Sequence, residues 1–181
     1  MTASIHPTAI VSESATLGEN VQVGPYCIVG RDVTLGDGAR LVSHVSIDGR
    51  TEVGARTTIY PFSSIGHPPQ DLKFEGEPST VSIGSDCVLR EYVTINPGTA
   101  GGGMETRVGN NCLLMVGVHI AHDCRVGNHV VMANQASLAG HCVVDDYVRF
   151  GGICGVHQFV RIGAHAFVGA MSFVENDVIP Y

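Results

Sequence analysis

Residues 112–159, CLLMVGVHIAHDCRVGNHVVMANQASLAGHCVVDDYVRFGGICGVHQF, contain the pattern that decides the fold. An aliphatic side chain, or a Met or Phe in its place, recurs there every six positions: Leu114, Ile120, Val126, Met132, Leu138, Val144, Phe150 and Val156. Four positions after each stands a residue small enough for a tight corner: Val118, Cys124, Val130, Ala136, Cys142, Val148, Cys154 and Val160. A recurrence of six fits neither the 3.6-residue period of a helix nor the alternation of an ordinary strand. The period therefore indicates a structural repeat.

The same period extends over nearly the whole chain. It runs without a slip from Ile5 to Ile59, resumes at Ile83, and continues from Val108 to Val174. Two segments interrupt it, the polar HPPQDLKFEGEPST (67–80) and the glycine-rich AGGGMET (100–106). We expect one domain, residues 1–181, with loops at about 66–82 and 100–106.

Each six-residue unit reads as a short extended segment followed by a corner, where Gly or Asn suits the positive φ of a tight turn. Three units make a triangular coil of 18 residues, and stacked coils pair their backbone groups with the coils above and below. The predicted fold is therefore all-β, a parallel β-helix with two inserted loops.

Composition and charge narrow the classes of partner. The formal net charge of −7 argues against nucleic acid, because binding of phosphate groups requires an excess of Lys and Arg. The first residues lack the basic region and apolar run of a signal peptide. No stretch approaches the roughly 20 apolar residues of a membrane span. We expect a cytoplasmic protein without stable membrane insertion.

All six cysteines stand at the small-residue position of a unit, which Ala, Ser, Thr and Val fill elsewhere: Cys27, Cys87, Cys112, Cys124, Cys142 and Cys154. No pair has the CxxC spacing of a zinc or redox site. We therefore expect buried, inert thiols.

The 18-residue coil brings distant histidines together. His122, His141 and His157 belong to units that stack on one face, so they form a cluster roughly 10 Å tall at the usual strand spacing. His119 is expected one corner earlier. The coil also places three arginines in one column, at the corner that ends the histidine-bearing face: Arg107, Arg125 and Arg161.

Three kinds of function suit this cluster. In acyl transfer, His122 could act as general base with Asp123 as its orienting carboxylate, and Gly140 would let an acyl carbonyl approach a backbone N–H. As a metal site, His119 and His122 with another histidine could bind zinc, as in the γ-class carbonic anhydrases. In an assembly scaffold, the histidines would only decorate a face.

Five motifs occur in order along the chain: HPPQDLKFEGEPS (67–79), VTINPGTAGGG (93–103), MVGVHIAHDCRVGN (115–128), NQASLAGH (134–141) and GVHQF (155–159). Together they resemble the UDP-N-acetylglucosamine O-acyltransferases, which start lipid A biosynthesis in Gram-negative bacteria. The resemblance runs from His6 to Asp177 and implies a left-handed β-helix and a homotrimer. It also implies transfer of a 3-hydroxyacyl group from acyl carrier protein to the glucosamine 3-hydroxyl of UDP-N-acetylglucosamine, without a cofactor or metal.

The resemblance assigns roles residue by residue. It makes His122 the general base, Asp123 its support, and Gly140 the backbone donor to the oxyanion. On the first loop it assigns contact with the sugar nucleotide to Gln70, Asp71 and Lys73. It places four further residues in the cleft: His119, His141, His157 and Gln158. The arginine column is a hypothetical guide for the acidic carrier protein.

Two departures from the family pattern stand out. The chain has Asn96-Pro97-Gly98 where the commonest pattern has His-Arg-Gly, so an amide replaces a cleft histidine. The family also has a C-terminal helical domain, which would begin about where this sequence stops, at Tyr181. Two alternatives stay open: a zinc enzyme resembling γ-class carbonic anhydrase, and an N-acyltransferase that acts on a related UDP-sugar.

Overall fold

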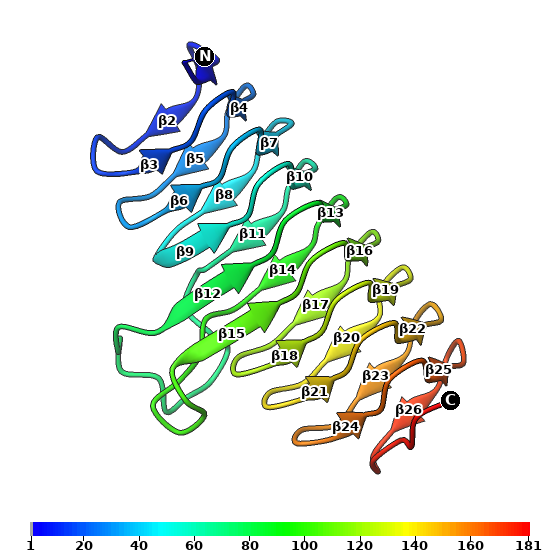
Figure 1. Ribbon diagram of the computed structural model, residues 1–181. Helices are drawn as coiled ribbons and strands as arrows, with labels where there is room; N and C mark the ends of the chain where they lie inside the picture. The colour runs from blue at the N-terminus through cyan, green and yellow to red at the C-terminus, as the bar shows by residue number, and fades with distance from the viewer. Residues whose placement is uncertain (1) are drawn as a thin grey trace.

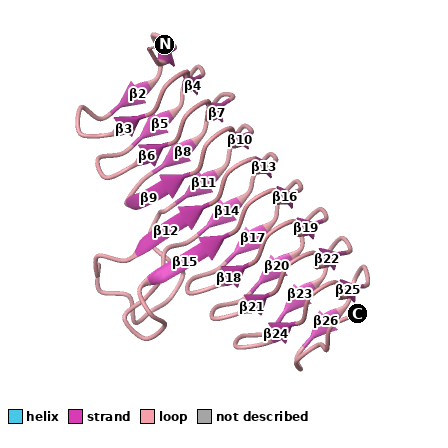
Figure 2. Cartoon of the chain, in the orientation of Figure 1, coloured by secondary structure: helices cyan, strands magenta, loops and turns pink. Residues whose placement is uncertain are grey.

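The computed structural model describes residues 2–181 and shows a three-sided prism of short parallel strands (Figure 1). Figure 2 shows strands joined by turns and loops, and no helix occurs in the described range. Within that range no helix is therefore long and apolar enough to cross a membrane. The coil runs from the N-terminus at one end of the prism to the C-terminus at the other without reversing direction, as the six-residue period predicts.

Each side of the prism is one parallel sheet. The first sheet contains β1 (Ser4–Ile5), β4 (Gln22–Val23), β7 (Arg40–Leu41), β10 (Thr58–Ile59), β13 (Val88–Leu89), β16 (Leu113–Leu114), β19 (Val131–Met132), β22 (Arg149–Phe150) and β25 (Phe167–Val168). The second sheet contains β2 (Ile10–Val11), β5 (Ile28–Val29), β8 (Ser46–Ile47), β11 (Ser64–Ile65), β14 (Thr94–Ile95), β17 (His119–Ile120), β20 (Ser137–Leu138), β23 (Gly155–Val156) and β26 (Phe173–Val174). The third sheet contains β3 (Thr16–Leu17), β6 (Thr34–Leu35), β9 (Arg50–Val53), β12 (Thr80–Ile83), β15 (Glu105–Val108), β18 (Arg125–Val126), β21 (Val143–Val144) and β24 (Arg161–Ile162).

The core is the column of side chains along the prism axis. Each unit contributes the second residue of its strand and the small residue of its corner, as Leu114 and Val118 illustrate, both fully buried. The packing ends with the prism, so Ile5 in the first coil is 45% exposed. The register of β17, β20 and β23 pairs Ile120 with Leu138 and Leu138 with Val156, which is the predicted 18-residue stacking.

The predicted burial of the cysteines is confirmed, because all six are free thiols inside the core. Burial raises the pKa of the Cys27 thiol. Hydrogen bonding with Cys142, and then burial, raises the pKa of the Cys124 thiol. These side chains therefore act as small core residues.

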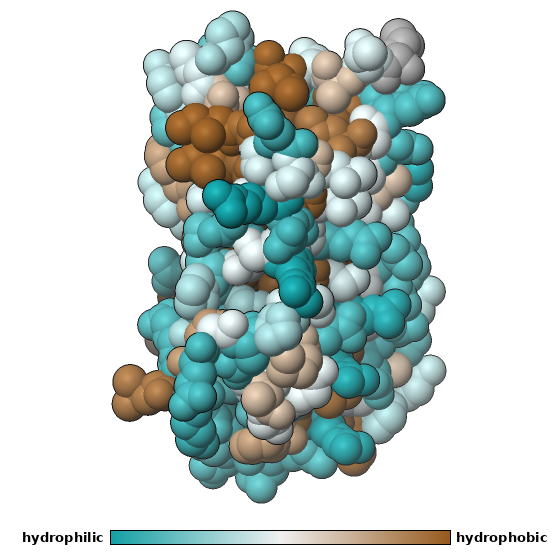
Figure 3. Space-filling view, turned by 90° about the vertical axis from the view of Figure 1, so that its left-hand side faces the viewer, coloured by the Kyte–Doolittle hydropathy of each residue, from teal (hydrophilic) through white to brown (hydrophobic). Residues whose placement is uncertain are grey.

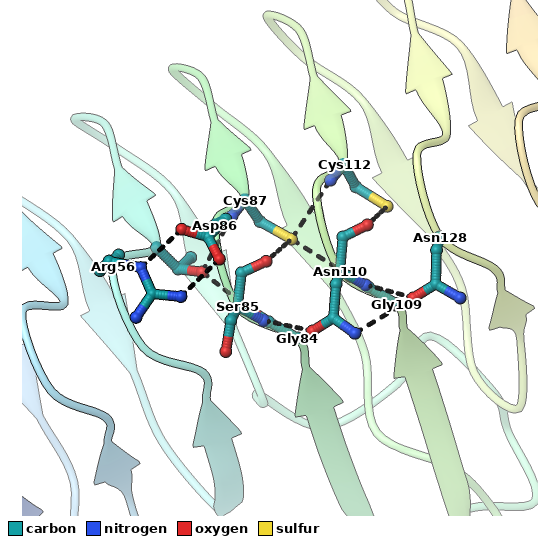
Figure 4. A network of polar contacts seen from close by, with 10 residues as sticks. Arg56, Gly84, Ser85, Asp86, Cys87, Gly109, Asn110, Cys112 and Asn128 are labelled. Carbon is teal, nitrogen blue, oxygen red and sulfur yellow. Dashed lines mark hydrogen bonds and ion pairs between the residues drawn. The ribbon is translucent and has the colours of Figure 1, made fainter.

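Side-chain hydrogen bonds connect successive corners along the edge between the third and first sheets (Figure 4). Asn128 Oδ1 accepts a hydrogen bond from the Asn110 backbone N–H at 2.8 Å, and Asn110 Oδ1 accepts one from the Ser85 backbone N–H at 2.8 Å. Arg56 forms two hydrogen bonds with the Asp86 carboxylate in the same region. Side chains thus pair the corner amides that the ladders of strands leave free.

The two interruptions lie at one edge of the prism, between the second and third sheets (Figure 1). The first joins β11 to β12 and the second joins β14 to β15. Their ends differ from the expected loops at 66–82 and 100–106. β12 begins at Thr80 and β15 at Glu105, because strand pairing extends each of these strands to four residues. The first loop is therefore 66–79 and the second 96–104, and both leave the strand register of the flanking coils intact.

Candidate active site

His122 and Asp123 form the corner between β17 and β18. Asp123 has a φ of +61°, a left-handed conformation that Asp tolerates better than most residues. This turn directs both side chains toward one another, and His122 Nδ1 lies 2.8 Å from Asp123 Oδ2. Both residues are buried, so the pair is shielded from competing water. Since a carboxylate only accepts hydrogen bonds, Nδ1 donates and Nε2 keeps its lone pair, which is the state that a general base requires.

The second loop holds the Asp123 carboxylate. Thr99 donates from its backbone N–H to Oδ1 at 2.9 Å and from its hydroxyl to Oδ2 at 2.6 Å. The Asp123 backbone N–H donates to Thr106 Oγ1 at 2.8 Å. Gly102 lies against the carboxylate, where any side chain would collide with it. The carboxylate is therefore fixed in place before any substrate arrives.

Gly140 lies next to the His122 ring, one coil further along. A Cβ at Gly140 would come 2.5 Å from His122 Cε1 and 2.7 Å from Nε2, so only glycine fits beside the imidazole. The Gly140 backbone N–H donates no hydrogen bond to residues 2–181. The Gly140 backbone, with its unpaired N–H, therefore packs against the ring that carries the basic nitrogen, and a base close to a backbone donor suits acyl transfer.

His141 lies on the open side of this pair. Its ring stacks on Phe159 at a centroid distance of 4.4 Å and meets the His122 ring edge-on at 5.0 Å. Its Nδ1 is 3.8 Å from Asp123 Oδ2, which is too far for a hydrogen bond. His141 is half-buried and lies at the mouth of the site.

A pocket of about 410 Å³ opens over the dyad of His122 and Asp123. It brings together residues from the first loop and from three successive corners: Gln70, Asp71, Leu72, Lys73, His122, His141, Gln158 and Phe159. In the first loop, Asp71 Oδ1 accepts a hydrogen bond from the Lys73 backbone N–H at 3.0 Å, which holds a tight turn over the pocket. Figure 3 shows the side of the molecule on which these corners lie, largely hydrophilic below a hydrophobic patch near the N-terminal end.

Two of the histidines expected in the cleft lie outside this pocket. His119 is not one corner earlier, as the sequence suggested, but in strand β17 itself, where its Nδ1 lies 2.7 Å from Thr94 Oγ1. Burial, and then the charge of His122, lowers the pKa of His119. His157 is exposed, with its Nδ1 3.3 Å from the Gln158 carbonyl oxygen and its ring edge-on to Phe173.

Asn96, the departure from the family pattern, is buried beneath the first loop. Its Nδ2 donates to the His67 carbonyl oxygen at 3.2 Å, and the His67 ring contacts Ser46 Oγ at 2.9 Å. Asn96 does not line the pocket. In this chain the amide therefore anchors the start of the first loop.

The zinc-site alternative requires a cluster of side chains whose ligand atoms lie close together. Among residues 2–181, a group that could hold an ion consists of His122, Asp123 and His141, with ligand atoms within 4.8 Å of one another. His119, which that alternative required, is not part of it. Asp123 Oδ2 already accepts hydrogen bonds from Thr99 and His122, so a metal bound at this oxygen would have to displace one of them. This donor set fits a hydrogen-bonded dyad better than a metal centre.

The arginine column is present, in a different place from the one expected. Arg107 pairs with Arg125, Arg125 with Val143, and Val143 with Arg161, as the 18-residue spacing predicts. The three arginines stand on strands of the third sheet and not on the corner itself, because strand pairing begins two residues after Asp123. All three are exposed.

Sequence reasoning missed four residues of the site. Phe159 and Leu72 line the pocket, while Thr99 and Thr106 hold Asp123. The spacing could have revealed Phe159, which stands 18 residues after His141. No comparable pattern pointed to Thr99, since loop residues follow no period.

Comparison with known families agrees with this geometry. Residues 14–49 and 105–140 match the bacterial transferase hexapeptide (six repeats). The acyl-[acyl-carrier-protein]–UDP-N-acetylglucosamine O-acyltransferase of Rickettsia canadensis is 58% identical over 123 residues, which cover 68% of this chain and 47% of that protein. The enzyme of the same name from Azorhizobium caulinodans is 56% identical over 126 residues, 70% of this chain and 46% of that protein. The chain thus spans about half the length of the curated relatives it matches.

Solved structures with a similar fold also belong to UDP-N-acetylglucosamine acyltransferases. A crystal structure of UDP-N-acetylglucosamine acyltransferase superposes with a TM-score of 0.98 at 44% identity, covering 98% of this chain and 69% of that one. The Acinetobacter baumannii structure superposes with a TM-score of 0.97 at 43% identity, with the same coverage. The predicted left-handed parallel β-helix is confirmed. With this likeness in sequence and structure, the chain belongs to the UDP-N-acetylglucosamine acyltransferase family.

Proposed function

We propose that the protein transfers a 3-hydroxyacyl group from acyl carrier protein to the 3-hydroxyl of UDP-N-acetylglucosamine, the first step of lipid A biosynthesis. One observation supports this most strongly. The ring of a carboxylate-bound His122 lines a pocket covered by the first loop and packs against the backbone of Gly140, whose N–H is free. A base and an oxyanion donor side by side match the needs of direct acyl transfer.

The proposed reaction uses only these groups. His122 Nε2 removes the proton from the sugar 3-hydroxyl as its oxygen attacks the thioester carbonyl carbon. The carbonyl oxygen becomes an oxyanion, which the Gly140 N–H stabilises. When the intermediate collapses, the C–S bond breaks and the leaving thiolate takes the proton from His122. Asp123 accepts a hydrogen bond from the Nδ1–H group throughout and stabilises the transient imidazolium, while the proton stays on the ring.

The first loop is suited to hold the acceptor. Lys73 brings a positive charge to the pocket, and Gln70 and Asp71 add hydrogen-bonding groups that suit a hydroxylated sugar. His141 and Gln158 complete the wall opposite this loop, and Phe159 supports the His141 ring. His119 and His157 lie outside this wall, so we expect smaller effects on sugar binding from their replacement.

Two further parts of the proposal concern partners. Acyl carrier protein is the donor, as the names of the curated relatives state for those enzymes. We also propose a homotrimer, in which a neighbouring subunit would add to the open side of the pocket. Sedimentation equilibrium tests the assembly directly, and a monomeric protein with full acyl transfer would contradict it.

The function is tested by acyl transfer with the full-length protein. UDP-N-acetylglucosamine and its 3-amino analogue are each offered with a panel of 3-hydroxyacyl carrier proteins, and the products are identified by mass spectrometry. We expect O-acylation of the sugar, and a loss of several powers of ten in kcat for His122→Ala. Transfer only to the 3-amine would instead establish the N-acyltransferase alternative. Full activity of His122→Ala would refute its role as base.

A further inference from the structure

Besides the Asn96–His67 hydrogen bond, the two loops are joined by a carboxylate that the proposed reaction does not use. Glu77, at the end of the first loop, accepts a hydrogen bond from the Ala100 backbone N–H on the second loop at 2.9 Å. Its other oxygen accepts one from the Glu75 backbone N–H at 2.9 Å. This carboxylate therefore connects the first loop, which lines the pocket, to the second loop, which does not.

The bridged segment of the second loop is the part that holds the dyad. Thr99 immediately precedes Ala100 and donates two hydrogen bonds to Asp123, one to each carboxylate oxygen. The Thr99 carbonyl oxygen accepts hydrogen bonds from the backbone N–H groups of Gly102 and Met104, each at 3.1 Å. Thr99 is only 5% exposed. A movement of Ala100 would therefore shift Thr99, and with it the orientation of Asp123.

A continuous chain of contacts thus leads from the pocket to the base. It runs from the turn at Asp71 and Lys73, through Glu77 and Ala100, to Thr99, Asp123 and finally His122. Every link beyond Glu77 is a hydrogen bond of 2.9 Å or less or a peptide bond. The polypeptide from Lys73 to Glu77 forms the remaining link.

We propose that Thr99 is a positioning residue for the His122–Asp123 dyad, and that Glu77 ties its placement to the loop that receives the sugar nucleotide. This inference rests on the proposed acyl transfer for its kinetic consequences, although the hydrogen bonds themselves do not depend on it. Binding of a substrate by the first loop would stabilise the second loop in the arrangement that orients the base.

The physical reason lies in the rotation of the carboxylate. A carboxylate that is free to turn about its Cβ–Cγ bond presents a hydrogen-bond acceptor to His122 in only part of its rotational range. The Thr99 backbone N–H and hydroxyl fix both oxygens, so Oδ2 stays in line with Nδ1. Hydrogen bonds to a charged group contribute about 1.5–3 kcal/mol each, which corresponds to about ten- to hundred-fold in rate if the interaction is lost in the transition state.

The test compares Thr99→Val with Thr99→Ser. Valine keeps the shape and the backbone donor but removes the hydroxyl, whereas serine restores the hydroxyl. We expect Thr99→Val to lower kcat about ten- to hundred-fold with little change in KM for the sugar nucleotide, and Thr99→Ser to recover most of the loss. Thr34→Val, in β6 and remote from the site, is the matched control.

A second readout does not require turnover. In protein labelled with 15N at histidine, the Nδ1–H proton of His122 should give a protected low-field resonance, because it is buried and bound to Asp123. We expect this resonance to broaden in Thr99→Val and to return in Thr99→Ser. If the wild type shows the resonance and transfers no acyl group, the proposed function fails and the positioning role stands. An unchanged resonance and an unchanged kcat in Thr99→Val would overturn the positioning role.

The role of Glu77 has its own comparison. Glu77→Ala should lower kcat and raise KM for the sugar nucleotide together, because the Ala100 end of the second loop loses its hydrogen bond to the first loop. Glu75→Ala removes a neighbouring exposed acid whose side chain does not bridge the loops, and it should leave both parameters near wild type. If the two alanine variants behave alike, Glu77 does not couple the loops.

Discussion

The imidazole of His122 and the backbone of Gly140 are in such close contact that a Cβ at Gly140 would come 2.5 Å from the ring. The two residues are 18 positions apart, one turn of the coil. The contact explains why glycine is required at this corner, since any larger residue would push the base away from the site.

Replacing Gly140 tests the contact directly. In Gly140→Ala the added methyl group would displace the His122 ring, and a misplacement of about 1 Å can reduce a rate about 10²-fold. We expect a loss of that order in kcat for acyl transfer. Gly155→Ala serves as control, because the nearest atom to its new Cβ would be 3.9 Å away. Equal activities of the two variants would contradict the steric explanation.

Replacing Asp123 with asparagine tests the tautomer of His122. An amide can donate to Nδ1, which would place the imidazole proton on Nε2 and leave no base facing the substrate. We expect a loss of about 10²–10⁴-fold in kcat with an intact fold. Kinetics and the 15N chemical shifts of the imidazole measure the two effects separately. An Asp123→Asn enzyme with an unchanged tautomer and rate would refute this role.

His119 should make the protein less stable in acid. Burial lowers its pKa in the folded state below the ordinary value of about 6.5. Below that pH the unfolded chain binds more protons than the folded one, so the free energy of unfolding falls as the pH decreases. In His119→Gln this part of the fall, which begins below about pH 6.5, should disappear. Urea denaturation at several pH values measures it, and parallel curves for variant and wild type would rule it out.

Leu138 and Leu72 should separate stability from binding. Leu138 is fully buried, so Leu138→Ala should reduce the free energy of unfolding by about 2–5 kcal/mol. Leu72 is fully exposed at the pocket, so Leu72→Ala should change it by less than about 0.5 kcal/mol and act instead on KM. Denaturant titration measures the stability of both variants, and kinetics measures KM for Leu72→Ala. A Leu138→Ala protein as stable as wild type, or an unchanged KM in Leu72→Ala, would contradict the corresponding assignment.

The arginine column should affect the carrier protein alone. Arg125 and Arg161 are exposed on the third sheet, and the chain as a whole has a net charge of −7. The double variant Arg125→Glu, Arg161→Glu should raise KM for the acidic acyl carrier protein at low salt, while KM for the sugar nucleotide stays unchanged. Added salt should reduce the difference. An unchanged KM for the carrier at low salt would disprove the docking role.

The sequence predicted the scaffold well because its period is a property of every unit. Leu138 or Val118 could be placed in the core from spacing alone, and the same spacing brought Gly140 to His122. The corners were harder to predict. His119 was expected at the corner before that of His122 but lies in strand β17. The period alone does not show where a strand begins and a turn ends.

The loops were the least predictable part, for a physical reason. Thr99 and Glu77 act through hydrogen bonds between two segments that have no repeat and whose shapes depend on each other. Asn96 stands where the resemblance implied a cleft histidine, yet its amide donates to the His67 carbonyl oxygen beneath the loop. Such pairings depend on the folded loops and not on spacing.

Both loops interrupt the coil at the same edge, and the strands on either side of each keep their pairing, as Ile65 with Ile95 and Ile95 with Ile120 illustrate. A segment inserted at this edge changes in length or sequence without moving any core side chain. Substrate preference can therefore diverge through the loops, provided that Thr99 and the Glu77–Ala100 hydrogen bond stay in place to orient Asp123. Exchanging residues 66–76 between relatives, with Glu77 kept, should transfer acceptor preference at little cost in stability, so this edge is where a new acceptor specificity can be built without altering the coil.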